Sequence, residues 1–350
     1  MSSIIKVDTI QDQAGNNIIN ESGNTITIGA SGDTITIPSG ATFTNSGTTS
    51  AITISGALTV DGGTIKLDGN YPTGTDNVAL GNEALDSGSL SGGNNTAIGD
   101  NALSANTSGS NNTAIGQAAL CTNLTGGSNV AVGRCALKLN TASNNVAVGY
   151  HSMCTTSSGT ENTAIGMSSL KSNTTADFNT ALGNQTLCKN TTGTNNTAVG
   201  ACALEANTTG GNNVAVGKSA LITNTTGICN TALGRTSMEL NTTGSCNVAV
   251  GKDALSNNTT AVYNTAVGFQ TLKVGTTATQ NTGIGALSLD AATTGSYNTG
   301  SGYASLSALT TGTCNVSAGY VAGSGITTGS CNVAIGAHTL SATSTGDRNT

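Results

Sequence analysis

The sequence predicts an all-β protein, a parallel β-solenoid built from coils of one repeating length. Three observations lead to this prediction: a short motif recurs at a fixed interval, each unit carries turn-forming residues at two places, and large aromatic residues are scarce. Only 3% of the 350 residues are aromatic and 8% are charged, whereas Gly occurs 48 times. Aromatic side chains normally supply much of the buried area of a globular core. A thin, repeated structure is therefore expected in place of two or three compact domains.

The recurring motif is Asn, then Thr or Val, then usually Ala, then usually Val, Ile or Leu, then Gly. Fourteen of the sixteen intervals between successive motifs are 17 residues long, and the other two are 18 and 16. A fixed period of this kind is the sequence signature of a solenoid. The motif begins at Asn77, Asn95, Asn112, Asn129, Asn145, Asn162, Asn179, Asn196, Asn213, Asn230, Asn247, Asn264, Asn281, Asn298, Asn315, Asn332 and Asn349.

One unit, residues 196–212, reads NTAVGACALEANTTGGN, and its positions are numbered here from 1 to 17. Gly at position 5 and Asn-Thr-Thr-Gly at positions 12 to 15 favour turns, so each coil is expected to hold two short strands between two turns. Position 4 is mostly Val, Ile or Leu and position 9 is Leu or Met from Leu85 to Leu306, whereas position 6 varies freely. Positions 4 and 9 are therefore predicted to face a buried seam. Examples are Val199, Leu204, Val216, Leu221, Val250 and Leu255.

Stacked coils place identical residues about 4.8 Å apart, so amide side chains can bond the copies above and below them. The predicted Asn ladder includes Asn196, Asn213, Asn230 and Asn247. Each coil offers only about two large aliphatic residues, which contribute roughly 3–5 kcal/mol when buried. Ordering the backbone of one coil costs on the order of 17 kcal/mol or more. A homotrimer that buries a further apolar face is therefore expected, with a monomeric solenoid as the alternative.

Units such as residues 196–212 and 241–257 resemble the head repeats of trimeric autotransporter adhesins. They resemble still more closely the 17-residue repeats of phage tail-fibre proteins that end in an endosialidase-type intramolecular chaperone. The resemblance covers residues 77–350 and implies a left-handed β-roll in a homotrimer, with no catalytic residue in the repeat. Segments that proteins of those families carry are not found in this sequence. They are the export signal and membrane anchor of the adhesins, and the chaperone of the tail fibres. We therefore expect the natural protein to continue past Thr350, or to have lost the chaperone.

The chain before the repeats divides into two predicted segments. Residues 1–20 form a docking or cap segment, in which the run Lys6-Val7-Asp8-Thr9-Ile10 resembles the first segment of structural proteins from marine phages. Residues 21–76 hold short alternating strands that lead into the solenoid at residues 77–350. Docking to a virion is the function expected of the first segment. Protection of the first coil from edge-to-edge pairing is the alternative.

Nine Cys residues invite a disulfide or metal interpretation. Two pairs lie one repeat unit apart, just before a repeat Asn, and stacking would bring their Cα atoms within disulfide range. The alternative is that Cys fills a small apolar slot, which suits a protein made in a cytoplasm. The spacing of a zinc site is absent. The candidate pairs are Cys229 with Cys246 and Cys314 with Cys331.

Several functions are not expected from this sequence. His151 and His338 lie far apart without a nucleophile pattern, so no catalytic residue, cofactor or metal is predicted and the protein is not expected to be an enzyme. Eleven scattered Lys and Arg residues in a chain of net charge −6 do not suit nucleic acid. Membrane insertion is not predicted, because no apolar run is long enough for a span. Residues 1–13 do not read as a secretory signal.

The leading hypothesis is a virion protein, a tail fibre or similar appendage that acts as a rigid spacer and host-attachment element. Its expected partners are two further copies of itself, a virion attachment protein bound through the N-terminus, and a host surface receptor or glycan. The alternative is a bacterial cell-surface adhesin or an extracellular filament subunit.

Overall fold

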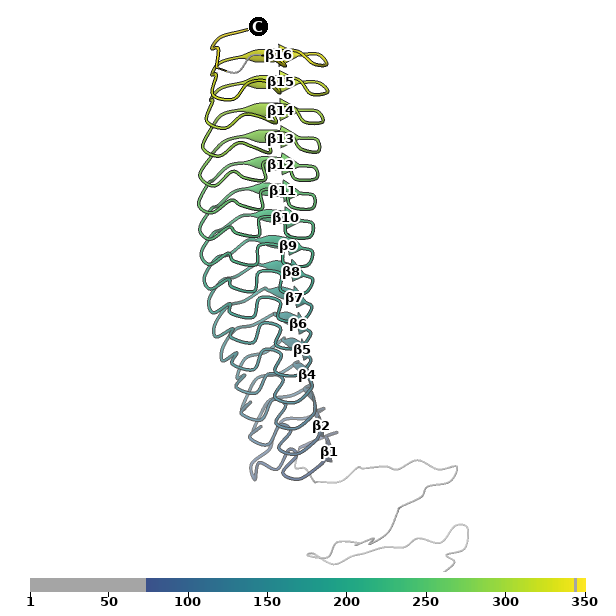
Figure 1. Ribbon diagram of the computed structural model, residues 1–350. Helices are drawn as coiled ribbons and strands as arrows, with labels where there is room; N and C mark the ends of the chain where they lie inside the picture. The colour runs from purple at the N-terminus through teal and green to yellow at the C-terminus, as the bar shows by residue number, and fades with distance from the viewer. Residues whose placement is uncertain (1–73, 343–344) are drawn as a thin grey trace, which may run out of the picture. The chain divides into compact units, whose positions relative to one another are not determined.

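The computed structural model describes residues 74–342 and 345–350. The segment predicted at 1–20 and nearly all of that at 21–76 lie outside the described residues. Within the described part, the chain forms strands and turns without any helix, and its coils stack into a parallel β-solenoid (Figure 1). The all-β solenoid with a 17-residue period is thus confirmed.

Each coil contributes one strand of three residues, at positions 2 to 4 of the unit. The strands are β1 (Val78–Leu80), β2 (Thr96–Ile98), β3 (Thr113–Ile115), β4 (Val130–Val132), β5 (Val146–Val148), β6 (Thr163–Ile165), β7 (Thr180–Leu182), β8 (Thr197–Val199), β9 (Val214–Val216), β10 (Thr231–Leu233), β11 (Val248–Val250), β12 (Thr265–Val267), β13 (Thr282–Ile284), β14 (Thr299–Ser301), β15 (Val316–Ala318) and β16 (Val333–Ile335).

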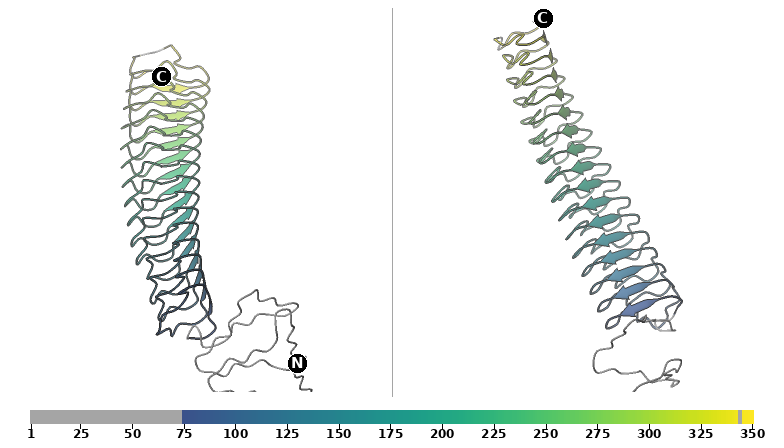
Figure 2. Two further views of the ribbon diagram at one scale, coloured as in Figure 1. Left: turned by 60° about the horizontal axis from the view of Figure 1, so that its bottom comes forward. Right: turned by 90° about the vertical axis from the view of Figure 1, so that its right-hand side faces the viewer.

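The strands pair in chain order into one parallel sheet along one side of the stack (Figure 2). Ala198 in β8 pairs with Ala215 in β9, which is a shift of one 17-residue unit. The two units of unusual length keep this register. In the longer one β1 still pairs with β2 through the central Ala of each strand, and in the shorter one β4 pairs with β5 in the same way. The extra and missing residues are therefore accommodated in the turns.

The expected second strand, around positions 8 and 9, is not formed in the described coils. Positions 7 and 9 of each coil have positive φ; in the unit that begins at Asn196, Cys202 has φ 58° and Leu204 has φ 52°. Left-handed residues at alternate positions cannot continue an extended strand. This part of the coil is a succession of turns whose backbone still bonds the next coil, as in the 3.0 Å bond from Leu204 N–H to Ala220 C=O.

Gly at position 5 makes the turn that follows each strand. Gly200 has φ 121°, and a Cβ placed on it would lie 2.8 Å from backbone atoms of Gly217 in the next coil. Both the dihedral angle and the close approach require glycine. The sixteen coils that contain strands all carry Gly here.

The core of each coil is thin and lies directly behind the strand. Ala at position 3 and Leu or Met at position 9 are its apolar parts, and Ala198 and Leu204 are both fully buried. Position 8 adds Ala, Ser or Thr. Each coil thus encloses little more than one large side chain, and the coils depend on their neighbours for burial.

Candidate interaction surface

The Asn ladder at position 1 runs through the buried interior. Asn213 donates a bond from its backbone N–H to Oδ1 of Asn196 at 3.0 Å and another from its Nδ2 at 3.2 Å. Asn230 bonds Asn213 in the same way, and Asn247 bonds Asn230. The four side chains are 0–1% exposed. Oδ1 of Asn196, of Asn213 and of Asn230 therefore each accepts two bonds from the next coil.

A second Asn ladder occupies position 12. Asn207 Nδ2 donates to Asn190 Oδ1 at 2.8 Å and to the carbonyl of Gly210 in its own coil at 2.8 Å. The same Gly210 carbonyl accepts a bond from Asn196 Nδ2 at 2.9 Å. The recurrence of Asn at position 12 was visible in the sequence, but its pairing with the first ladder required the fold.

The second ladder changes character toward the C-terminal coils. Position 12 is Asn258 in one coil and then Gly275, Ala292, Leu309 and Ile326 in the next four. Asn258 Oδ1 is buried without a hydrogen-bond partner, because Gly275 has no side-chain amide to donate to it. Leu309 and Ile326 are buried, so these last coils replace an amide ladder with an apolar one.

Position 4 corrects a prediction about the core. Val199, Val216 and Val250 were expected in the buried seam, but Val199 and Val250 are only half-buried and Val216 is 38% exposed. In a strand of three residues only the middle side chain points inward, and that residue is Ala. Leu204, Leu221 and Leu255 at position 9 do lie in the core, at 0–1% exposure.

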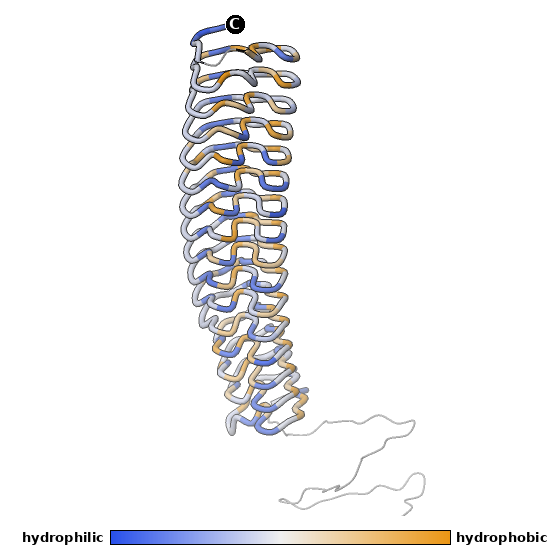
Figure 3. Tube along the Cα trace, viewed as in Figure 1, coloured by the Kyte–Doolittle hydropathy of each residue, from blue (hydrophilic) through white to orange (hydrophobic). Residues whose placement is uncertain are grey.

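The position-4 side chains form a long apolar column on the outer face of the sheet, and the hydropathy pattern repeats from coil to coil (Figure 3). Fourteen of the sixteen described strands end in Val, Ile or Leu. At about 4.8 Å per coil, the unbroken part of the column, from β1 to β13, extends for roughly 60 Å. Ser301 and Ala318 interrupt it before Ile335. Its members are Leu80, Ile98, Ile115, Val132, Val148, Ile165, Leu182, Val199, Val216, Leu233, Val250, Val267, Ile284 and Ile335.

Position 6 is exposed and chemically varied. Tyr303 and Tyr320 stack with ring centroids 5.6 Å apart, and His338 meets Tyr320 edge-on at 5.3 Å. Arg134 bonds Gln117 Oε1 at 2.9 Å and the Tyr150 hydroxyl at 3.3 Å. Side chains of this column therefore contact one another from coil to coil, and Tyr320 also contacts His338 at the neighbouring position 7.

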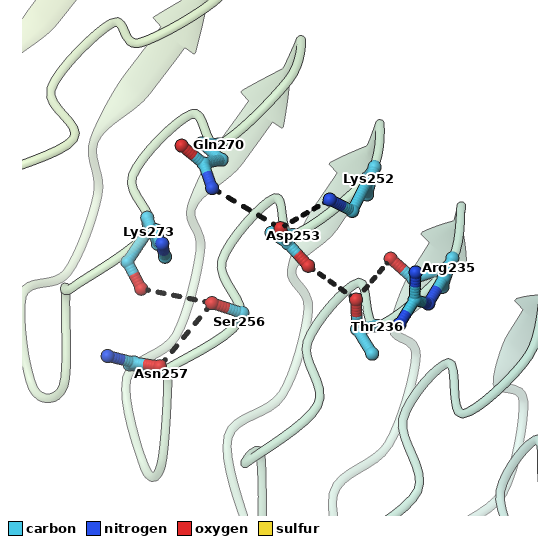
Figure 4. Close-up of polar contacts among 8 residues, drawn as sticks. All are labelled: Arg235, Thr236, Lys252, Asp253, Ser256, Asn257, Gln270 and Lys273. Carbon is cyan, nitrogen blue, oxygen red and sulfur yellow. Dashed lines mark hydrogen bonds and ion pairs between the residues drawn. The ribbon is translucent and has the colours of Figure 1, made fainter.

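A polar cluster surrounds Asp253 at position 7, where three successive coils meet (Figure 4). Its carboxylate accepts hydrogen bonds from the Thr236 hydroxyl and, at 3.3 Å, from Gln270 Nε2, and it lies 3.5 Å from Lys252 Nζ. Partial burial opposes ionisation, but these hydrogen bonds and the Lys252 charge outweigh it and lower the pKa of Asp253. The carboxylate is thus held in its charged form.

The nine Cys residues are all free thiols. Cys229 and Cys246 occupy position 17 of adjacent coils, as do Cys314 and Cys331, but neither candidate pair is a disulfide in the structure. Elsewhere, burial raises the pKa of Cys121, Cys154 and Cys188, which makes them weaker nucleophiles at neutral pH.

The two His residues lie in different surroundings. His151 stacks on Tyr150 with ring centroids 4.0 Å apart. Partial burial, together with the charges of Lys171, Arg134 and Lys138, lowers the pKa of its imidazole.

The described residues do not bring three or more His, Cys, Asp or Glu side chains together as metal ligands. In the same part of the chain, no helix has the length and apolar character needed to cross a membrane.

Comparison with known proteins adds no relative. No protein-family model matches the chain, and no curated protein sequence matches it.

Proposed function

We propose that the protein is the shaft of a virion fibre, a left-handed β-roll that assembles as a homotrimer and holds a host-attachment element away from the particle. The observation that carries this proposal is the apolar column at position 4. A single rod leaves the unbroken part of this column, from β1 to β13, uncovered for roughly 60 Å.

The surface of a monomeric protein is not expected to carry an apolar column that repeats on one coil after another. Scattered exposed apolar residues are ordinary on soluble proteins, but long contiguous patches mark contacts with another macromolecule. Leu182 and Leu233 are each 37% exposed and Ile284 is 47% exposed, whereas Ala181 and Ala232, at position 3 beside the first two, are fully buried. A second and third copy of the same rod would carry matching columns at the same spacing, so parallel association covers all three.

A rod of stacked coils also suits a spacer. Backbone bonds join each coil to the next along most of its length, and the buried Asn ladders oppose sliding between coils. Such a rod resists bending and extends with every added unit. The resemblance to phage tail-fibre repeats supplies the biological context, which includes attachment to the virion through the N-terminus and recognition of a host receptor or glycan.

The number of chains in the assembly tests the proposal. Light scattering on the purified protein is expected to give three chains. The double variant Val216→Lys and Leu233→Lys should give one chain with the β-type circular dichroism retained, because both side chains are exposed in the isolated rod but buried in the trimer. The control, Asn184→Lys with Thr209→Lys, adds the same charge at exposed positions outside the column and should remain trimeric.

A wild-type protein of one chain would contradict the proposed assembly. So would a trimer that survives both column substitutions unchanged.

A further inference from the structure

We propose that Lys218, Arg235 and Lys252 form a binding site for a linear acidic glycan that runs along the rod. The inference rests on the proposed function for its biological setting, since it names the chemistry of the receptor. The site itself is argued from the positions and contacts of these three side chains, together with the neighbouring Phe269.

The three cations are stacked on successive coils. Each stands at position 6, two residues after the strands β9, β10 and β11, which pair in register. All three side chains are exposed. Because neighbouring coils lie about 4.8 Å apart, the arrangement is a row of three positive charges on one line.

Such a row is unfavourable unless an anion occupies it. Like charges on adjacent strands repel, and the chain has only 11 Lys and Arg residues and a net charge of −6. Among the described residues, the one ion pair formed by these three cations is that between Lys252 and Asp253. Asp253 also accepts bonds from Thr236 and Gln270, and its single negative charge offsets only one of the three positive charges of the row.

Arg134, in the same column, shows the contrasting arrangement. Its guanidinium bonds Gln117 and Tyr150 and lies over the Tyr150 ring, 5.7 Å from the centroid. That cation is satisfied by its neighbours. Lys252 is similarly placed, beside Asp253 and over the Phe269 ring. The contrast is with Arg235, which has cationic neighbours on both sides in its column and is exposed.

Phe269 extends the row on the next coil. Its ring is 44% exposed, and Lys252 Nζ lies 5.4 Å from its centroid. An exposed aromatic ring beside cations suits a pyranose, whose C–H face packs on the ring while its acidic group meets the ammonium. The site therefore offers charge and an apolar surface side by side.

The spacing favours an acidic glycan over nucleic acid. A linear polyuronate carries one carboxylate per sugar ring, and the long side chains of the row, on coils about 4.8 Å apart, can reach several carboxylates of one chain. A nucleic-acid duplex carries its charges more densely, about 3.4 Å apart along each strand, so the row matches it less well. In a homotrimer the rod would present three copies of the site.

The experiment measures binding of polygalacturonate to the full chain, with neutral dextran, dextran sulfate and oligothymidylate as comparison probes. The test variant is Lys218→Ala with Arg235→Ala and Lys252→Ala. The matched control is Lys138→Ala with Lys171→Ala and Lys189→Ala, which removes the same charge from other columns. A further variant, Phe269→Ala, removes the ring and leaves the charge unchanged.

Polygalacturonate is expected to bind at low salt, and neutral dextran is not. Loss of three exposed charge contacts should weaken binding about tenfold, and the control triple should stay within about twofold of wild type. Phe269→Ala should weaken the binding of polygalacturonate more than the binding of dextran sulfate. Dextran sulfate is more densely charged, so its binding depends less on packing against the ring. Binding should weaken with salt at a log–log slope of about −2, as for three contacts to a single-stranded polyanion.

Four results would overturn the proposal: no binding of polygalacturonate, equal loss in both triple variants, no loss in the test triple, or tighter binding of oligothymidylate. Light scattering on the same samples separates this from the proposed function. A trimer that does not bind polygalacturonate rejects the site alone, and a single chain that binds it rejects the trimeric fibre alone.

Discussion

The side chains of Asn196 and Asn207 donate hydrogen bonds to one carbonyl oxygen, that of Gly210, at 2.9 and 2.8 Å. These residues stand at positions 1, 12 and 15 of one unit, and the arrangement recurs in the neighbouring coils. One ladder is thereby tied to the other in each of these coils. Two buried columns of amides act as a single network, which is more costly to interrupt than two separate ones.

Interrupting the first ladder should destabilise the rod strongly. In Asn213→Ala, the Asn230 N–H loses its acceptor, and Asn196 Oδ1 loses the bond from Nδ2 but keeps the one from the backbone N–H of residue 213. An unsatisfied buried group costs about 1–3 kcal/mol, so a loss of at least that size in unfolding free energy is expected, measured by denaturant titration. Asn184→Ala, at an exposed site outside the ladder, should change it by less than about 0.5 kcal/mol. Equal effects of the two substitutions would show that the ladder does not stabilise the rod.

The second ladder should tolerate change at its end but not in its middle. Asn258→Ala leaves Asn241 Oδ1 without its bond, but Asn258 Oδ1 already lacks one, so the end of the ladder simply moves by one coil. Asn224→Ala instead breaks bonds to coils on both sides. Asn224→Ala is expected to cost about 1–3 kcal/mol more than Asn258→Ala. Thermal unfolding of the two variants, side by side, gives the comparison.

β-Branched residues at position 9 should destabilise the rod even though this position is apolar. Leu204 has φ 52°, and the described coils carry Leu, Met or Gly here, never Val or Ile. Leu204→Met should cost less than about 1.5 kcal/mol, since Met153 and Met238 already occupy this position. Leu204→Ile keeps the volume but places a β-branched side chain in the left-handed region, which should cost at least about 1 kcal/mol more. If isoleucine were tolerated as well as methionine, the left-handed backbone at this position would be wrong.

Two carboxyl groups should give opposite dependences on pH. The pKa of Asp253 is lowered in the folded protein, so it contributes stability above its unfolded value near 3.9, and this is lost as pH falls through the folded pKa. Burial raises the pKa of Asp290, whose Oδ1 has no partner, so its cost appears as pH rises above that unfolded value.

At neutral pH, Asp253→Asn should therefore lower the melting temperature and Asp290→Ser should raise it. Ser already occupies the equivalent position in the following coils, as Ser307 and Ser324. Both differences should shrink as the pH is lowered until each carboxyl is protonated in both the folded and the unfolded state. The effect of Asp253 should be below about 1 kcal/mol because the group is partly solvated. A pH-independent difference would assign the effects to packing.

The period of the motif was enough to predict the solenoid, because a register kept from Asn77 to Asn349 admits few other folds. Leu204, Leu221 and Leu255 were also correctly placed in the core, because position 9 is Leu or Met in nearly every unit. The Asn residues at position 1 could be placed in a ladder for a similar reason. A buried amide needs a partner, and in a stack the nearest partner is its own copy.

The sequence could not show whether the position-4 side chains point into the core or out of it. Val216 is as regularly apolar as Leu221, yet it points outward, because the strand is only three residues long and its middle residue, Ala215, takes the inward place. The absence of a second strand depends on left-handed residues at positions 7 and 9, which composition does not reveal, since Cys202 and Leu204 are not typical of that conformation. The sequence alone therefore determined that units stack and which columns are alike. Only the folded coil decided which face each column occupies, because direction depends on backbone dihedral angles and bonds from neighbouring coils.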